Sequence, residues 1–130
     1  MPKVLISDAM DDIAEKILLS NNIEVDVITN FTPDELNQNI ISYDGLIVRS
    51  ATKVNKEVIE NAKNLKVVGR AGAGVDNIDI NAAKQKNIIV MNTPGGNTNA
   101  TAEHTLALLL SLSRKISKAD ITTHKGEWAK

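Results

Sequence analysis

The sequence predicts an α/β protein of the flavodoxin-like class, with a doubly wound parallel β-sheet. Two observations lead to this prediction. Over residues 1–96, short apolar runs alternate with segments that carry helix-capping residues and helical apolar spacing. The lengths between the apolar runs also suit crossover connections, which parallel strands require and which are almost always right-handed.

Five candidate strands are recognised by their hydrophobic patterns. In chain order they cover residues 3–8, 23–29, 45–50, 66–68 and 88–92. The first and third are nearly continuous apolar runs, as in buried strands. The second alternates between apolar and polar side chains, so we expect it at an edge of the sheet.

Four candidate helices connect these strands. The first two begin at predicted caps, Asp11 or Asp12 and Thr32, and the third and fourth are expected to start at Asn55 and Asp79. Pro33 follows Thr32 at the first helical position, where its missing N–H costs nothing. The second helix is expected to end near residue 43, and the fourth at residue 86.

The last part of the chain is predicted to be one long helix over residues 98–116, after a loop at residues 93–97. It is apolar nearly all round because of five leucines, at positions 106, 108, 109, 110 and 112. Such a helix must be buried on several sides, and a domain of this size cannot cover it alone. Residues 117–130 are polar and predict no further helix or strand. We therefore divide the chain into a sheet domain, 1–96, and a C-terminal segment that carries the long helix, 97–130.

The composition excludes several classes of function. The 15 basic and 16 acidic residues give a formal net charge of −1, without the basic excess of proteins that bind nucleic acids or membrane surfaces. The chain has no cysteine, which excludes disulfides and thiolate sites. It has neither a secretory signal pattern nor the roughly 20 consecutive apolar residues of a membrane span. We expect a soluble, cytoplasmic protein that binds neither nucleic acid nor membrane.

Two strand ends carry residues suited to binding an anion, and ligands of doubly wound proteins bind at the carboxyl ends of the strands. Arg49 follows the third strand and can offer a planar fork of donors to a carboxylate or phosphate. The alternative is a surface arginine paired with a neighbouring acid. The glycines in Gly72-Ala73-Gly74 would let the backbone approach an anion, or they could merely allow a tight turn. This segment is not a dinucleotide fingerprint, because position 77 is asparagine and no acid stands near positions 90–92.

The remaining candidates are weaker. Asn97 could bind a ligand or cap the long helix, and the residues alone favour the cap. Neither His104 nor His124 has an acid at a spacing that would orient it as a base, and their separation matches no metal-ligand pattern. No metal site is therefore predicted. The residues alone indicate a small-anion site on an α/β domain.

Three longer sequence blocks together are typical of a known protein family. They are V-R-S-A-T-K-V at 48–54, G-R-A-G-A-G-V-D-N-I-D at 69–79 and V-M-N-T-P-G-G-N-T-N-A-T-A-E-H at 90–104. In this order and spacing they resemble the D-isomer-specific 2-hydroxyacid dehydrogenase family, and the resemblance extends over essentially the whole chain. It implies a flavodoxin-like substrate domain whose last helix crosses into a Rossmann domain that binds NAD.

The resemblance also implies roles for individual residues. Those expected to hold the substrate are Arg49, Ser50, Gly72, Ala73, Gly74 and Asn97. The resemblance also places Ala73 at the nicotinamide end of NAD. Relatives often carry a hydroxyl-bearing residue at this position. Since alanine has no hydroxyl, the contact expected here is made by the backbone. The dinucleotide fingerprint and the arginine, glutamate and histidine of hydride transfer lie beyond the end of this sequence in similar proteins. No catalytic residue is therefore assigned, and the missing domain would bind most of the NAD.

The implied activity is oxidation of a small phosphorylated hydroxy acid, 3-phosphoglycerate, to 3-phosphohydroxypyruvate, the first step of serine biosynthesis. We expect this chain to be the N-terminal part of such an enzyme, inactive alone, and the full-length enzyme to be a homo-oligomer. Two alternatives stay open: a dehydrogenase of another D-2-hydroxy acid, and a stand-alone flavodoxin-like binding module. In the second case, self-association of this chain would have to cover the leucine helix.

Overall fold

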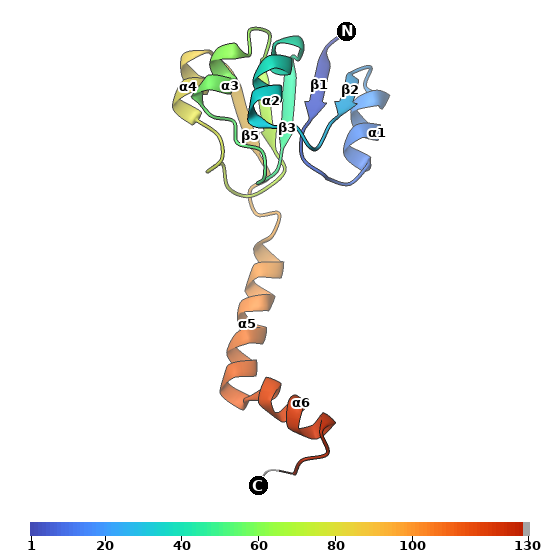
Figure 1. Cartoon of the computed structure of the whole chain (residues 1–130), viewed down its shortest axis with the longest axis vertical. Coiled ribbons are helices and arrows are strands. Elements are labelled where there is room, and N and C mark those ends of the chain that lie inside the picture. Colours follow the sequence, from blue (N-terminus) through green and yellow to red (C-terminus); the bar gives the residue numbers. More distant parts are fainter. Residues whose placement is uncertain (129–130) are drawn as a thin grey trace. The chain divides into compact units, whose positions relative to one another are not determined.

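A computed structural model describes residues 1–128 of the chain (Figure 1). The chain divides into two compact units, one from Met1 to Gly96 and one that begins at Asn97. Each unit is described by itself. The predicted polar end at positions 129 and 130 lies outside the described residues.

The first unit is built on a five-stranded, fully parallel sheet. Its strands are β1 (Lys3–Ile6), β2 (Glu24–Val27), β3 (Gly45–Val48), β4 (Val67–Arg70) and β5 (Ile89–Asn92). Their spatial order is β2-β1-β3-β4-β5, which is the flavodoxin-like order. The predicted fold class is confirmed, and so is the edge position of the second strand.

Short helices connect the strands. They are α1 (Ile13–Ser20), α2 (Pro33–Asn39) with the 3-10 turn η1 (Ile40–Ser42), α3 (Lys56–Asn61) and α4 (Ile80–Gln85). The third and fourth helices follow directly on Asn55 and Asp79, close to their predicted starts, and each of these residues caps its helix by accepting a backbone N–H through its side chain. Thr32 forms a full capping box with Glu35, and Pro33 occupies the first helical position. At α1, Asp11 rather than Asp12 accepts an N–H, that of Ile13, at 2.9 Å.

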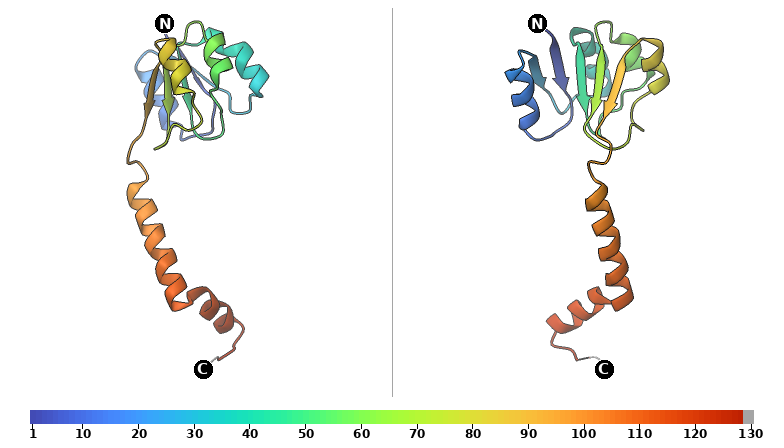
Figure 2. Two further views of the ribbon diagram at one scale, coloured as in Figure 1. Left: turned by 90° about the vertical axis from the view of Figure 1, so that its left-hand side faces the viewer. Right: turned by 180° about the vertical axis from the view of Figure 1, so that it is seen from behind.

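The hydrophobic core lies on the sheet face that α2, α3 and α4 cover (Figure 2). It is fully aliphatic at its centre, where the most buried side chains include Leu5, Ile40, Leu46, Val48, Ile59 and Val68. Helix α1 lies on the other face, beside β2, and buries none of its residues. The rest of that face stays open, with Ile89 and Met91 exposed by 62% and 58%. A parallel sheet is normally covered on both faces, so this open face is unusual.

The second unit consists of two helices where one was predicted. Helix α5 (Thr98–Arg114) ends two residues earlier than expected, because Lys115 adopts a left-handed conformation with φ of 52°. Helix α6 (Ile116–His124) follows directly, so the prediction that residues 117–130 form no helix is wrong. Its polar sequence lacks an amphipathic pattern, and hydroxyls of Thr122 and Thr123 bond back to carbonyls one turn earlier.

The leucines of α5 are all exposed in this chain, by 57% to 80%, and no residue of the helix is buried. Within residues 1–128, no helix combines the length and the apolar character needed to cross a membrane.

Candidate functional site

The candidate site lies at the carboxyl ends of β1, β3, β4 and β5, which meet at one edge of the sheet. In this strand order, β1 and β3 flank the topological switch point, where ligands of doubly wound proteins bind. Three loops build the edge: Ser7 and Asp8 after β1, residues 49–52 after β3, and residues 71–77 after β4.

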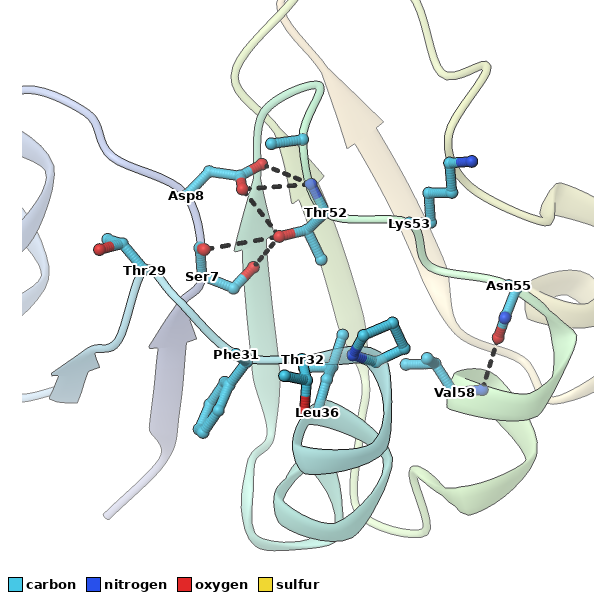
Figure 3. A pocket seen from close by; sticks show the side chains of 12 residues that line it. Ser7, Asp8, Thr29, Phe31, Thr32, Leu36, Thr52, Lys53, Asn55 and Val58 are labelled. Carbon is cyan, nitrogen blue, oxygen red and sulfur yellow. Dashed lines mark hydrogen bonds between the residues drawn. The ribbon is translucent and has the colours of Figure 1, made fainter.

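Asp8 joins the first two loops at the switch point. Its side chain belongs to a residue that is only 5% exposed. Its carboxylate accepts the Arg49 N–H at 2.6 Å. It also accepts the Thr52 hydroxyl at 2.7 Å and the Thr52 N–H at 3.1 Å, as Figure 3 shows. A buried carboxylate needs such donors to be stable. In return it fixes both ends of the 49–52 segment, while the N–H groups of Ser50 and Ala51 have no acceptor among the described residues.

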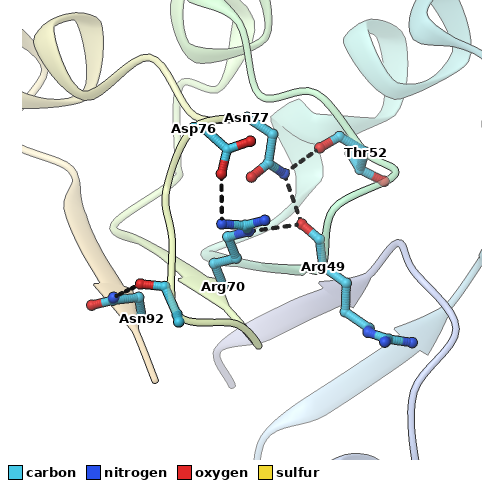
Figure 4. A network of polar contacts seen from close by, with 7 residues as sticks. Arg49, Thr52, Arg70, Asp76, Asn77 and Asn92 are labelled. Carbon is cyan, nitrogen blue, oxygen red and sulfur yellow. Dashed lines mark hydrogen bonds and ion pairs between the residues drawn. The ribbon is translucent and has the colours of Figure 1, made fainter. Parts of the chain in front are cut away.

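The Arg49 side chain is available at this edge. Its Nη1 donates to the carbonyl of Ala9 at 3.0 Å, and no carboxylate within residues 1–128 pairs with it. The alternative of a surface arginine bound to a neighbouring acid therefore does not hold for the described part of the chain. Figure 4 shows the side chain extending away from Arg70 and Asn77. A guanidinium with free donors is well suited to a planar carboxylate or to phosphate.

The glycine loop after β4 rests on Arg70. The side chain of this arginine is 11% exposed, and its Nη1 lies 2.9 Å from Asp76 Oδ1. A Cβ at Gly74 would lie 2.7 Å from the same Nη1, whereas a Cβ at Gly72 would come no closer than 3.6 Å to any atom of Arg70. A methyl group at position 74 would therefore push aside the ends of the Arg70 and Asp76 side chains, whereas position 72 has room for a methyl group.

Two asparagine amides and Arg70 hold backbone carbonyls of these loops (Figure 4). Asn77 Nδ2 donates at 2.7 Å to both the Arg49 and the Thr52 carbonyl. Arg70 Nε adds a bond of 3.3 Å to the Arg49 carbonyl, and Asn92 Nδ2 donates to the Ala73 carbonyl at 2.8 Å. The carbonyl oxygens of Arg49, Thr52 and Ala73 are therefore engaged by side chains of the protein.

A cavity of about 430 Å³ lies beside the switch point, between the loops after β1 and β3 and the starts of α2 and α3 (Figure 3). Asp8 and Thr52 form its polar wall, and Phe31, Leu36 and Val58 form its apolar wall. No group of three or more acidic, histidine or cysteine side chains that could hold a metal occurs in residues 1–128.

The largest pKa shifts are at the opposite end of the sheet, around Lys3 in β1. Its ammonium lies 2.9 Å from Asp26 and from Glu24, which raises its own pKa and lowers that of Asp26. Tyr43 is buried and donates to Asp26 at 2.8 Å, and burial raises its pKa to about 12. This network ties the edge strand to the core, away from the candidate site.

Comparison with known proteins identifies the family of this chain. Residues 4–126 match the family described as D-isomer specific 2-hydroxyacid dehydrogenase, catalytic domain. This chain belongs to that family. It is 50% identical over 126 residues to the D-3-phosphoglycerate dehydrogenase of Archaeoglobus fulgidus and 48% identical to that of Sus scrofa. These matches cover 97% of this chain but 24% of each relative, so the chain spans about a quarter of their length.

Solved structures agree with this membership. An NAD+-bound 3-phosphoglycerate dehydrogenase of Entamoeba histolytica superposes with a TM-score of 0.74 at 36% identity, over 85% of this chain and 38% of that one. The fold and the family are therefore established for this chain.

Most of the predicted site residues lie on this one edge. They are Arg49, Ser50, Gly72, Ala73 and Gly74, and their contacts to ligand remain predictions. Asn97 belongs to the second unit, where it occupies the cap position of α5 without a side-chain hydrogen bond, so the predicted cap bond is absent. The sequence analysis missed Asp8, which follows a buried strand just as Arg49 does. It also missed Arg70, Asn77 and Asn92, whose partners only the tertiary structure reveals.

Both histidines of the chain lie in the second unit. The expectation that no acid can orient either of them is wrong for His124, because Asp120 lies one helical turn before it at 3.3 Å. Both partners are exposed, so this is a surface pair. Within residues 1–96, the candidate site presents hydrogen-bond donors suited to an anion, and this unit contains no histidine.

Proposed function

We propose that this chain is the substrate domain of an NAD-dependent D-3-phosphoglycerate dehydrogenase, which oxidises 3-phosphoglycerate to 3-phosphohydroxypyruvate. The observation that carries the proposal is the exposed guanidinium of Arg49, which has no acidic partner in the described residues and stands at the switch point of the sheet. The names of the relatives from Archaeoglobus fulgidus and Sus scrofa support the choice of substrate. The doubly negative phosphate and the carboxylate of that substrate both require such donors.

The residues then have distinct tasks. Arg49 and Ser50 hold one anionic group of the substrate, and the Gly72–Gly74 backbone holds the other. Asn97 adds a contact from the second unit. Bound NAD would supply the hydride acceptor for this oxidation, and residues outside this chain would hold most of it. Ala73 suits the nicotinamide end, because its methyl group is small and exposed and its carbonyl is already bound by Asn92.

Two apolar surfaces support the proposed domain division, with residues 1–96 as substrate domain and 97–130 as linker helix and start of the NAD-binding domain. One is the open sheet face around Ile89 and Met91, and the other is the leucine surface of α5. Monomeric proteins rarely expose large apolar patches, so both surfaces call for a cover. We propose that the chain is the N-terminal part of a cytoplasmic, homo-oligomeric enzyme of serine biosynthesis, inactive alone.

The proposal is tested by calorimetric titration of the 130-residue chain with 3-phosphoglycerate, with unphosphorylated glycerate and with NADH. We expect measurable binding of 3-phosphoglycerate, weaker binding of glycerate and none of NADH. Equal binding of glycerate would favour a dehydrogenase of another D-2-hydroxy acid. Tight NADH binding would contradict the assignment of the cofactor to residues outside this chain.

Sedimentation of the same sample tests the stand-alone module. That alternative requires a defined oligomer in which helix α5 is covered, and it would gain support if neither acid bound.

A further inference from the structure

Side chains behind the two loops that face the anion determine whether N–H groups or carbonyl oxygens of the loop backbone point toward it. This inference rests on the proposed function, because it concerns how the same edge binds its anion. At the two ends of the 49–52 segment, the N–H groups of Arg49 and Thr52 donate to the Asp8 carboxylate. The carbonyls of the same two residues accept from the Asn77 amide. Between these anchors, the N–H groups of Ser50 and Ala51 have no described acceptor.

Asn77 makes the contacts that orient this segment. One amide nitrogen, Nδ2, lies 2.7 Å from the carbonyl oxygens of both Arg49 and Thr52. Its Oδ1 is buried and has no partner. The reverse orientation of the amide would place an oxygen against two carbonyl oxygens, so the hydrogen-bond network itself assigns the nitrogen to this position.

The electrostatic reason for such an anchor is simple. A carbonyl oxygen near a phosphate or carboxylate repels it, and an N–H attracts it. If the peptide groups of the loop can flip, a carbonyl oxygen faces the anion in part of the molecules. The apparent affinity for the anion is then the intrinsic affinity multiplied by the fraction of molecules whose N–H groups face it. Donors behind the loop remove the wrong orientation before the ligand arrives.

Arg70 and Asn92 extend the same arrangement. Arg70 Nε shares the Arg49 carbonyl with Asn77, and Asn92 holds the Ala73 carbonyl in the glycine loop. Asn77 alone anchors two carbonyls of the 49–52 segment, and it belongs to a different loop from the one that it holds. It is therefore the member whose removal should affect the segment most.

We infer that Asn77 is a positioning residue for substrate binding: its amide holds the Arg49 carbonyl, and with it the peptide plane that carries the Ser50 N–H, so that this N–H serves the anion, and its bond to the Thr52 carbonyl fixes the far end of the segment. Asn77 itself does not touch the substrate.

The test compares two variants with the wild-type chain, Asn77→Asp and Asn37→Asp. Both replace an amide nitrogen by oxygen without a change in size. Asn37, on α2, is a matched control because its Oδ1 is also buried without a partner, and it lies outside the loops of the site. Amide hydrogen exchange at Arg49 and Thr52 reports loop order, titration with 3-phosphoglycerate reports binding, and thermal unfolding reports stability.

For Asn77→Asp we expect the two loop amides to exchange faster and the dissociation constant to rise, each by about tenfold, the loss of roughly one hydrogen bond. For Asn37→Asp we expect both quantities to stay within about twofold of wild type even at a similar loss of stability. Wild-type loop exchange and affinity in Asn77→Asp would overturn the inference, and so would equal changes in both variants.

Loop exchange also separates this inference from the proposed function. If the wild-type chain does not bind 3-phosphoglycerate, the proposed function fails, while faster exchange confined to the loop in Asn77→Asp still supports the positioning role.

Discussion

Removal of the Asp8 carboxylate should destabilise the protein more than removal of any exposed acid. Asp8 accepts from three donors, the Arg49 N–H, the Thr52 N–H and the Thr52 hydroxyl, at 2.6, 3.1 and 2.7 Å. In Asp8→Ala all three lose their acceptor. A hydrogen bond to a charged group contributes about 1.5 to 3 kcal/mol, and water can replace part of this at a half-exposed loop. We therefore expect the free energy of unfolding to fall by about 2 to 4 kcal/mol in total.

Two further variants define the mechanism of this loss. Asp8→Asn keeps one acceptor oxygen and the same volume, so it should cost about half as much as Asp8→Ala, roughly 1 to 2 kcal/mol. Asp34→Ala removes an exposed carboxylate in the first turn of α2 and should cost under about 1 kcal/mol.

The assay is urea unfolding of each chain at pH 7, followed by far-ultraviolet circular dichroism. The reasoning would be refuted if Asp8→Ala and Asp34→Ala lost the same stability, because the three donors would then have been satisfied equally well by water.

Three other changes have defined outcomes. Arg49→Ala should leave unfolding unchanged within about 0.5 kcal/mol but weaken 3-phosphoglycerate binding by about 10- to 100-fold, measured by calorimetry; unchanged affinity would remove Arg49 from the site. Gly74→Ala should displace the Arg70–Asp76 ion pair beneath the glycine loop and lower both the stability and the affinity for 3-phosphoglycerate, whereas Gly72→Ala should be tolerated. Unfolding followed by circular dichroism and calorimetric titration compare the two variants. Equal effects of the two substitutions would contradict the close-approach argument. Lys3 lowers the pKa of Asp26, so the stability from this pair is complete above about pH 4 and is lost as pH falls through the lowered pKa. Asp26→Asn should therefore flatten the acid limb of the stability profile, and an unchanged limb would assign acid unfolding to other carboxylates.

The parts of the fold that could be predicted are those with a local signal. Alternation in the second strand indicated its edge position, and the Thr32, Asn55 and Asp79 caps act on neighbouring backbone groups, so residue type and spacing suffice. Lys115 carries no such signal, because lysine rarely adopts a left-handed conformation, and the break between α5 and α6 was missed for that reason.

The site was only partly predictable for a related reason. Arg49 and the glycines stand at strand ends, where a single residue type already indicates a chemistry. Asn77 acts on carbonyls 25 and 28 positions away, and Asp8 on donors more than 40 positions away. Such partners depend on which strands are neighbours in the sheet, and an asparagine after a glycine loop looks like any turn residue. The residues proposed to contact a ligand were thus easier to predict than the residues that hold their loops in place.

The most direct test of the proposed site is the location of 3-phosphoglycerate on the chain, by titration of ¹⁵N-labelled protein and mapping of its amide chemical shifts. We predict that the shifted amides concentrate in residues 49–52 and 72–74, with Ser50 and Ala51 among the largest changes. Shifts concentrated instead around Thr29 and Phe31 in the neighbouring cavity, or no saturable shifts at all, would contradict the assignment of the anion to this edge of the sheet.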